Sequence, residues 1–212
     1  MSEKKIPRAV ILDCDGVIVD SEPVTLDMIR MDVARYGLVM DDAQVHGLVG
    51  GTMADVARRA RGLGADLPED WVDAFYARLA EGVALIPGIE PLLDRLDAAG
   101  IVTGVGSNGS DQKMQVTLGQ HPTVRDRFAV ILSGQTLGRP KPAPDLYLEV
   151  ARRLDVPPAD CVVVEDSPTG ARAGIAAGMR VMGYAPEGNP ALSDVGAEVF
   201  ASLNDLPALL GL

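Results

Sequence analysis

The positions of apolar residues divide the chain into three stretches. A short continuous apolar run at residues 9–12 lies between Pro7 and Gly16, which is typical of a strand buried in a parallel sheet. Residues 22–86 instead repeat apolar side chains at the spacing of amphipathic helices, and no run there is typical of a strand. From residue 87 onward, short apolar runs alternate with helical patterns. The chain is therefore predicted to form one strand, then a helical block, then alternating strands and helices.

The middle stretch predicts four helices. The first has one apolar face and ends near Gly37, and a shorter second helix follows it. The third opens with a capping box from Thr52 to Asp55, in which side chain and backbone of the first turn bond to each other. The fourth starts at Pro68 and carries Trp71 toward a small helical core.

The alternation after residue 87 predicts a parallel sheet with helices on both faces. Strands are expected at residues 101–105, 128–132, 161–164, 180–183 and 198–201. Helices are expected between Pro91 and Gly100 and at residues 110–118, 144–154, 168–177 and 204–210. The predicted fold class is α/β, a Rossmann-like three-layer core with a parallel sheet and an inserted helical cap. We assign the core to residues 1–18 and 87–212, and the cap to residues 19–86.

The composition fits a globular protein and argues against several partners. Of the 212 residues 47% are hydrophobic, which is enough for a sizeable core. The net charge of -11 argues against binding to nucleic acid or to an anionic membrane. No apolar run reaches the roughly 18 residues of a membrane span, and Cys14 and Cys161 are expected to be reduced. We therefore expect a soluble cytoplasmic protein, either a monomer or a homodimer.

Polar side chains gather where the predicted parallel strands end. In open α/β sheets, binding sites form at the carboxyl ends of the strands. Four strand ends supply candidate side chains, which are in chain order Asp13, Asp15 and Gly16, then Ser107 and Asn108, then Lys141, then Glu165 and Asp166. The sequence therefore predicts one shared site at this edge of the sheet.

The charges of these residues predict what the site binds. Four carboxylates that converge on one pocket repel one another unless a cation joins them, and Mg²⁺ is the usual cation beside bound phosphate. Lys141 adds a fixed positive charge, while Ser107 and Asn108 offer neutral donors, so the set predicts a phosphoryl site. One carboxylate attacks phosphorus and a second carries a proton. We assign these roles to Asp13 and Asp15, although charge alone does not fix their order.

Four motifs resemble those of the haloacid dehalogenase superfamily. They are Asp13-Cys14-Asp15-Gly16-Val17, Ser107-Asn108, Lys141-Pro142-Ala143-Pro144-Asp145 and Glu165-Asp166-Ser167-Pro168. Together they span nearly the whole chain in the family's order. The helical insertion is similar to the small cap of the subgroup that contains β-phosphoglucomutase and phosphoglycolate phosphatase.

The resemblance implies a role for each predicted site residue. Asp13 would be the nucleophile and Asp15 the acid and base, with Ser107 and Lys141 on the phosphate. Mg²⁺ would be held by Asp13, the carbonyl of Asp15 and Asp166, with Glu165 as a further ligand or the neighbour of one. We add Gly16 and Asn108 to the predicted phosphate-binding residues.

Departures from the family pattern favour phosphate-ester hydrolysis. Dehalogenases proper lack the second aspartate, because a halide needs no proton, so Asp15 argues against dehalogenation. Thr25 and Met53 stand where β-phosphoglucomutase has a histidine and a phosphate-binding arginine in its cap. We therefore predict a Mg²⁺-dependent phosphatase that hydrolyses a small phosphorylated metabolite, a sugar or sugar-acid phosphate, through an aspartyl-phosphate.

Three alternatives remain open from the sequence. A phosphomutase of the β-phosphoglucomutase type would use the same scaffold to isomerise its substrate. A phospho-aspartate signalling module also joins an acidic cluster to a lysine, but such modules are smaller and lack the insertion at residues 22–86. A catalytically silent homologue would act as a binding protein, which the presence of all the catalytic positions argues against.

Overall fold

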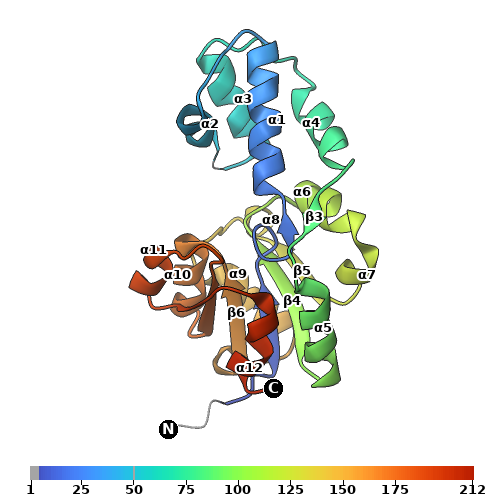
Figure 1. Cartoon of the computed structure of the whole chain (residues 1–212), viewed down its shortest axis with the longest axis vertical. Helices are drawn as coiled ribbons and strands as arrows, with labels where there is room; N and C mark the ends of the chain where they lie inside the picture. The colour runs from blue at the N-terminus through green and yellow to red at the C-terminus, as the bar shows by residue number, and fades with distance from the viewer. Residues whose placement is uncertain (1–4, 50) are drawn as a thin grey trace.

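The computed structural model describes residues 5–49 and 51–212. It has an α/β core at one end and a group of helices that stands above it at the other (Figure 1). The C-terminus lies at the end of the core opposite these helices. Residues 1–4 of the predicted core and Gly50 of the predicted cap lie outside the described residues.

A parallel six-stranded sheet in the order β5-β4-β1-β6-β7-β8 forms the centre of the core. Its strands are β1 (Ala9–Leu12), β4 (Val102–Ser107), β5 (Val130–Ser133), β6 (Cys161–Glu165), β7 (Arg180–Tyr184) and β8 (Glu198–Phe200). Strand β1 lies between β4 and β6 and pairs with both in parallel register. Its residues are therefore buried on both faces, as the continuous apolar run predicts.

Alternate side chains of β1 enter two different hydrophobic cores. Val10 and Leu12 pack in the layer that contains α5 (Ile89–Ala98) and α12 (Leu206–Leu210). Ala9 and Ile11 pack in the opposite layer with α9 (Asp145–Arg153) and α10 (Pro168–Ala176). This alternation follows from the period of two in a strand. The core therefore has the three layers predicted from the sequence.

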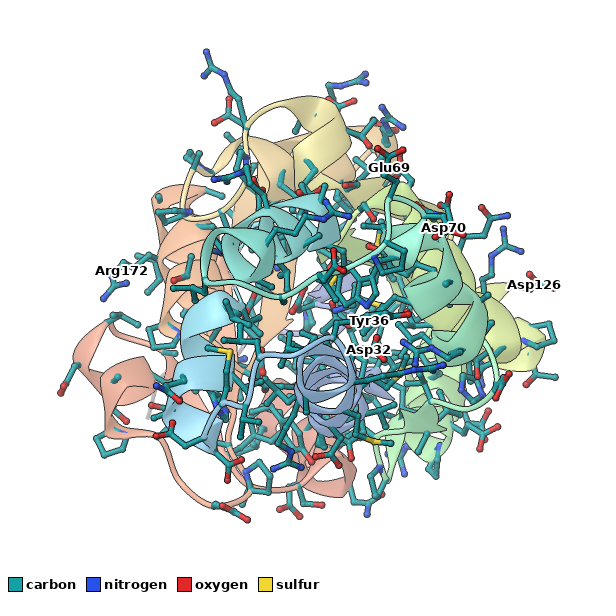
Figure 2. All side chains as sticks on the ribbon, turned by 90° about the horizontal axis from the view of Figure 1, so that it is seen from above. Asp32, Tyr36, Glu69, Asp70, Asp126 and Arg172 are labelled. Carbon is teal, nitrogen blue, oxygen red and sulfur yellow. The ribbon has the colours of Figure 1, made fainter. Side chains whose placement is uncertain are left out.

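The helices above the core share one small interior. They are α1 (Glu22–Arg35), α2 (Asp42–Leu48), α3 (Met53–Gly62) and α4 (Trp71–Leu79). Inside, Trp71 donates from Nε1 to Asp32 at 2.7 Å, and Arg78 donates from Nη1 to the same carboxylate at 2.8 Å. Figure 2 looks down on this end, where Asp32 and Tyr36 lie near the centre of the view. The buried charge of Asp32 is thus paired and hydrogen-bonded, which such a charge requires.

The predicted capping box is confirmed, since Thr52 caps α3 together with Asp55. The structure also shows that Ser167 caps α10 by accepting the N–H of Gly170 at 3.0 Å. Helix α4 begins at Trp71, three residues after the predicted start at Pro68. The remaining short helices are α6 (Asp111–Thr117), α7 (Pro122–Arg125), α8 (Gly134–Leu137) and α11 (Pro190–Asp194).

The expectation of no strand between residues 22 and 86 is wrong. Strand β3 (Ala84–Leu85) pairs antiparallel with β2 (Val19–Asp20), so the chain enters and leaves the helical cap through adjacent segments. Each strand has two residues, which is too short to produce a visible alternation in the sequence. No helix of the described chain is long and apolar enough to cross a membrane.

Candidate active site

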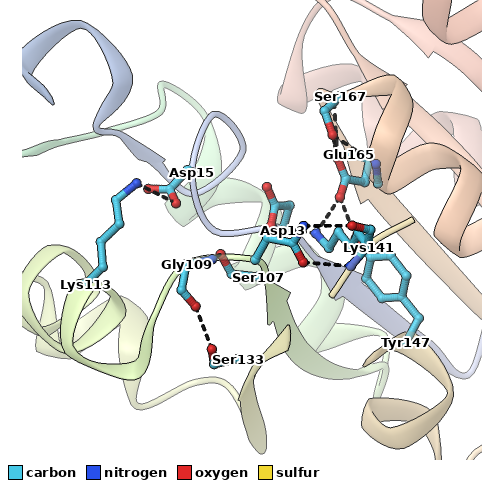
Figure 3. A network of polar contacts seen from close by, with 12 residues as sticks. Asp13, Asp15, Ser107, Gly109, Lys113, Ser133, Lys141, Tyr147, Glu165 and Ser167 are labelled. Atoms are coloured by element: carbon cyan, nitrogen blue, oxygen red, sulfur yellow. Dashed lines mark hydrogen bonds and ion pairs between the residues drawn. The ribbon is translucent and has the colours of Figure 1, made fainter. Parts of the chain in front are cut away.

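The predicted site residues follow the carboxyl ends of the central strands, as expected from the topology (Figure 3). Asp13 follows β1 directly, and its N–H bonds to the carbonyl of Val164 in β6 at 2.9 Å. Ser107 ends β4 and Glu165 ends β6. The segment after α8 brings Lys141 to the same edge, where its ammonium meets two of these carboxylates.

Lys141 is the cation at the centre of this site. Its Nζ donates to Oδ1 of Asp13 at 2.8 Å and to Oε1 of Glu165 at 2.5 Å, and only 3% of its side chain is exposed. Burial by itself would lower the pKa of Lys141, but the charges of Asp13 and Glu165 outweigh burial and raise this pKa above its usual range. Lys141 is therefore charged at neutral pH.

Glu165 holds Lys141 in place and is itself held on both oxygens. The Tyr147 hydroxyl donates to Oε1 of Glu165 at 2.6 Å, and the backbone N–H and hydroxyl of Ser167 reach Oε2 at 3.2 and 2.9 Å. A side chain at Gly170 would place its Cβ 1.7 Å from Oε1, so only glycine leaves room for this carboxylate. Glu165 therefore fixes the position of Lys141. Tyr147 is a hydrogen-bond partner of Glu165 that was not predicted from the sequence.

Three carboxylates converge beside Lys141 in a geometry that suits a cation. Asp13, Glu165 and Asp166 each offer an oxygen, and these atoms lie within 4.8 Å of one another. Burial, followed by the charge of neighbouring carboxylates, raises the pKa of Asp13 to about 7 and that of Asp166 to about 8. Lys141 opposes both shifts without cancelling them, so Asp13 and Asp166 still hold protons at a pH where an exposed aspartate is ionised. An all-oxygen set of this kind fits a hard divalent cation.

Gly16 is shaped to admit this acidic cluster. Its φ is +79°, in the left-handed region, and a Cβ there would lie 2.1 Å from Oδ2 of Asp166. Any larger residue would displace Asp166. The structure thus gives the predicted residue Gly16 a steric role next to the carboxylates.

Asp15 points away from the three-carboxylate cluster. Its Oδ2 lies 2.9 Å from Nζ of Lys113 on α6 (Figure 3). Its Oδ1 accepts a hydrogen bond from the hydroxyl of Ser21, the residue before α1. The carboxylate of Asp15 is therefore not part of the cluster of Asp13, Glu165 and Asp166. Neither Lys113 nor Ser21 was among the predicted site residues.

Ser107 and Asn108 form hydrogen bonds that hold the loops around the site. The Ser107 hydroxyl accepts the N–H of Gly109 at 2.9 Å, and Ser133 donates to the Gly109 carbonyl at 2.7 Å. The Asn108 amide bonds to the Lys141 backbone in both directions, accepting from its N–H at 2.8 Å and donating to its carbonyl at 3.2 Å. The side chain of Asn108 is therefore a clamp on the Lys141 loop.

Cavities lie on both sides of this edge. Two small ones, of about 160 and about 190 Å³, lie between cap and core and share Asp15, Thr25 and Lys113 in their walls. A wider one of about 620 Å³ lies beside Gly16 and Asp166 on the side of Tyr184. Asp15 thus lines both small cavities, and Asp166 of the carboxylate cluster lines the smaller of them as well.

Comparisons with known proteins agree with this geometry. Residues 7–178 match the family model of haloacid dehalogenase-like hydrolases. The chain is 31% identical over 202 residues to hexitol phosphatase A of Escherichia coli, covering 89% of this chain and 88% of that protein. It is 34% identical over 181 residues to phosphoglycolate phosphatase of Xanthomonas campestris, covering 82% and 81%. It spans 49% of the length of the bifunctional riboflavin kinase/FMN phosphatase of Arabidopsis thaliana, at 30% identity over 193 residues and 85% of this chain.

A solved structure shares the whole fold. The structure of CbbY from Rhodobacter sphaeroides in complex with phosphate aligns with a TM-score of 0.76 at 29% identity. The alignment covers 97% of this chain and 100% of that chain. The cap is therefore part of the shared fold.

Proposed function

The chain belongs to the haloacid dehalogenase-like hydrolases and is a phosphoric monoester hydrolase. We propose that it is a Mg²⁺-dependent phosphatase. Its substrate is a small phosphorylated metabolite, a sugar or sugar-acid phosphate, which reacts through an aspartyl-phosphate. The observation that carries the proposal is the convergence of Asp13, Glu165 and Asp166 around a buried lysine, Lys141.

The residues present fit a resident Mg²⁺. Asp13 and Asp166 would hold it with the backbone carbonyl of Asp15, and Glu165 would lie beside them. Bound there, Mg²⁺ would neutralise the phosphate oxygens and the carboxylates around them. Burial, followed by the charge of neighbouring carboxylates, raises the pKa values of Asp13 and Asp166, and a cation bound between them would favour their deprotonated forms.

The remaining residues act in two successive displacement steps at phosphorus. An oxygen of Asp13 attacks phosphorus, the bond to the ester oxygen breaks, and Asp15 gives its proton to the departing alkoxide. Asp15 then takes a proton from water, whose oxygen attacks the aspartyl-phosphate, so that phosphate leaves and the Asp13 carboxylate is restored. Lys141 stabilises the phosphate charge throughout. Ser21 and Lys113 orient the Asp15 carboxylate between these two proton transfers.

Mg²⁺ is expected to stabilise the protein more at pH 8.5 than at pH 6. The folded-state pKa values of Asp13 and Asp166, about 7 and about 8, lie above the usual 3.8, so the folded protein holds protons that the unfolded chain releases. Their contribution to stability is therefore lost as pH rises from about 4 to about 8. Mg²⁺ binds the deprotonated carboxylates and reverses that loss.

Scanning fluorimetry at both pH values measures this effect as the increase in Tm on adding 5 to 10 mM Mg²⁺. We expect an increase on the order of a few degrees. The Asp166→Asn variant serves as the control, because it lacks one of the titrating ligands. An increase that is equal at the two pH values, or larger at pH 6, would contradict the assignment of these carboxylates.

A panel of phosphate esters tests the proposed function directly. We expect phosphate release from at least one sugar or sugar-acid monophosphate, falling by more than about 100-fold when EDTA removes the metal. The panel includes p-nitrophenyl phosphate as a generic ester, and glucose 1-phosphate with glucose 1,6-bisphosphate as activator to detect mutase activity. Release from none of the esters, or isomerisation without release, would overturn the proposal.

A further inference from the structure

The two small cavities beneath the cap adjoin each other and share lining residues around Asp15. Both are bordered by Asp15, Thr25, Val49 and Lys113. The cap contributes both apolar and polar side chains to the walls, and the core contributes polar ones. The apolar side chains from the cap are Leu26, Val49, Met53 and Val56, and the polar ones from the core include Ser110 and Gln135. A group that departs from phosphorus toward Asp15 would enter this space.

Thr25 contributes an unpaired polar atom to this lining. Its side chain is 7% exposed, and its hydroxyl has no hydrogen-bond partner among residues 5–49 and 51–212. A threonine in a helix commonly bonds to the carbonyl four residues earlier. That carbonyl, of Ser21, accepts the backbone N–H of Thr25 at 3.0 Å, and the hydroxyl does not share it. A buried hydroxyl without a partner is costly and rare in folded proteins, which points to a ligand group as its partner.

The charges of the lining restrict that ligand. Among the lining residues that the structure describes, Lys113 is the sole cation, and its Nζ is already 2.9 Å from Asp15. Glu22 and Asp166 add negative charge to the same walls. A second phosphate or a carboxylate on the departing group would therefore meet no unpaired cation here.

We propose that Thr25 is a specificity-determining residue, whose hydroxyl hydrogen-bonds a hydroxyl of the departing group. The site then selects monophosphates of small, uncharged polyols or sugars over bisphosphates and over esters without hydroxyls. This inference rests on the proposed phosphatase function and narrows its substrate class.

The experiment compares Thr25→Val with Thr25→Ser. Valine keeps the shape of threonine and removes the hydroxyl, whereas serine keeps the hydroxyl. For each form, kcat/KM is measured with glycerol 1-phosphate and sorbitol 6-phosphate as polyol esters, and with propyl phosphate and p-nitrophenyl phosphate as esters without hydroxyls. Fructose 6-phosphate and fructose 1,6-bisphosphate form a further matched pair.

We expect wild type to favour at least one polyol ester over propyl phosphate, and to favour fructose 6-phosphate over the bisphosphate. Thr25→Val should lower kcat/KM for that polyol ester about 10- to 100-fold more than for propyl phosphate, as the loss of one buried hydrogen bond implies. Thr25→Ser should keep the wild-type ratio to within about threefold.

Equal losses of kcat/KM on both kinds of ester in Thr25→Val would mean that Thr25 has a structural role and makes no hydrogen bond to the departing group. That result would overturn the inference. Hydrolysis of p-nitrophenyl phosphate without any preference for polyol esters would also overturn it, while the proposed phosphatase function would stand. Absence of Mg²⁺-dependent hydrolysis of every ester would overturn both.

Discussion

Replacing Asp13 with asparagine is expected to lower kcat for phosphate-ester hydrolysis by more than about 10³-fold. The amide cannot form the acyl-phosphate bond, whereas its oxygen can still accept the hydrogen bond that Lys141 gives to Oδ1 of Asp13. The fold should therefore persist, with circular dichroism and gel filtration unchanged. Turnover is measured with the best ester of the panel at saturating Mg²⁺.

The matched control for this variant is Asp126→Asn. Asp126 has 71% of its side chain exposed and lies at the edge of the molecule (Figure 2). Its replacement makes the same chemical change far from the carboxylate cluster, so kcat should stay within about twofold of wild type. Activity of Asp13→Asn within about tenfold of wild type would exclude Asp13 as the nucleophile.

Replacing Lys141 with methionine is expected to cause the largest loss of stability, about 3–5 kcal/mol. The change leaves Asp13 and Glu165 buried without their shared cation, and the Glu165 side chain has no exposed surface. Hydrolysis should fall together with stability, because the phosphate loses its fixed positive charge. The measurement is urea unfolding in the absence of metal, with the midpoint and slope both fitted.

The control for Lys141 is a lysine whose ion pair is exposed. Lys5 pairs with Asp160, and 72% of its side chain is exposed. Lys5→Met should change the free energy of unfolding by less than about 1 kcal/mol, because water screens such pairs. A loss in Lys141→Met no greater than that in Lys5→Met would contradict the central role of this buried lysine.

Much of the fold could be predicted, because the spacing of apolar residues indicates where helices and buried strands lie. The run at residues 9–12 is buried on both sides by two neighbouring strands, and only an apolar run tolerates that position. The helical insertion was visible from its period and from the capping box at Thr52. Strands β2 and β3 were missed, because two residues cannot display a period.

The strand-end residues of the site could be predicted because the topology of a parallel sheet gathers them. Asp13, Lys141, Glu165 and Asp166 are far apart in sequence yet meet at one edge. Their partners could not be predicted, because Tyr147 and Lys113 lie on helices whose rotation depends on packing. Thr25 could be placed in the cap from sequence, but its unpaired hydroxyl appears only in three dimensions.

If Asp13 carries the phosphate covalently, acid-quench labelling detects the phosphorylated protein. Radiolabelled acetyl phosphate is the probe, because its leaving group needs no proton and the first step can proceed without an acid. The Asp15→Asn variant is used beside wild type, because it cannot take a proton from water and should retain the intermediate.

We expect protein-bound label in Asp15→Asn that hydroxylamine releases and that maps to the peptide containing Asp13. Adding Asp13→Asn to this variant should remove the label. Phosphate release with no protein-bound label at any quench time, or label that persists without the Asp13 carboxylate, would exclude Asp13 as the phosphate carrier.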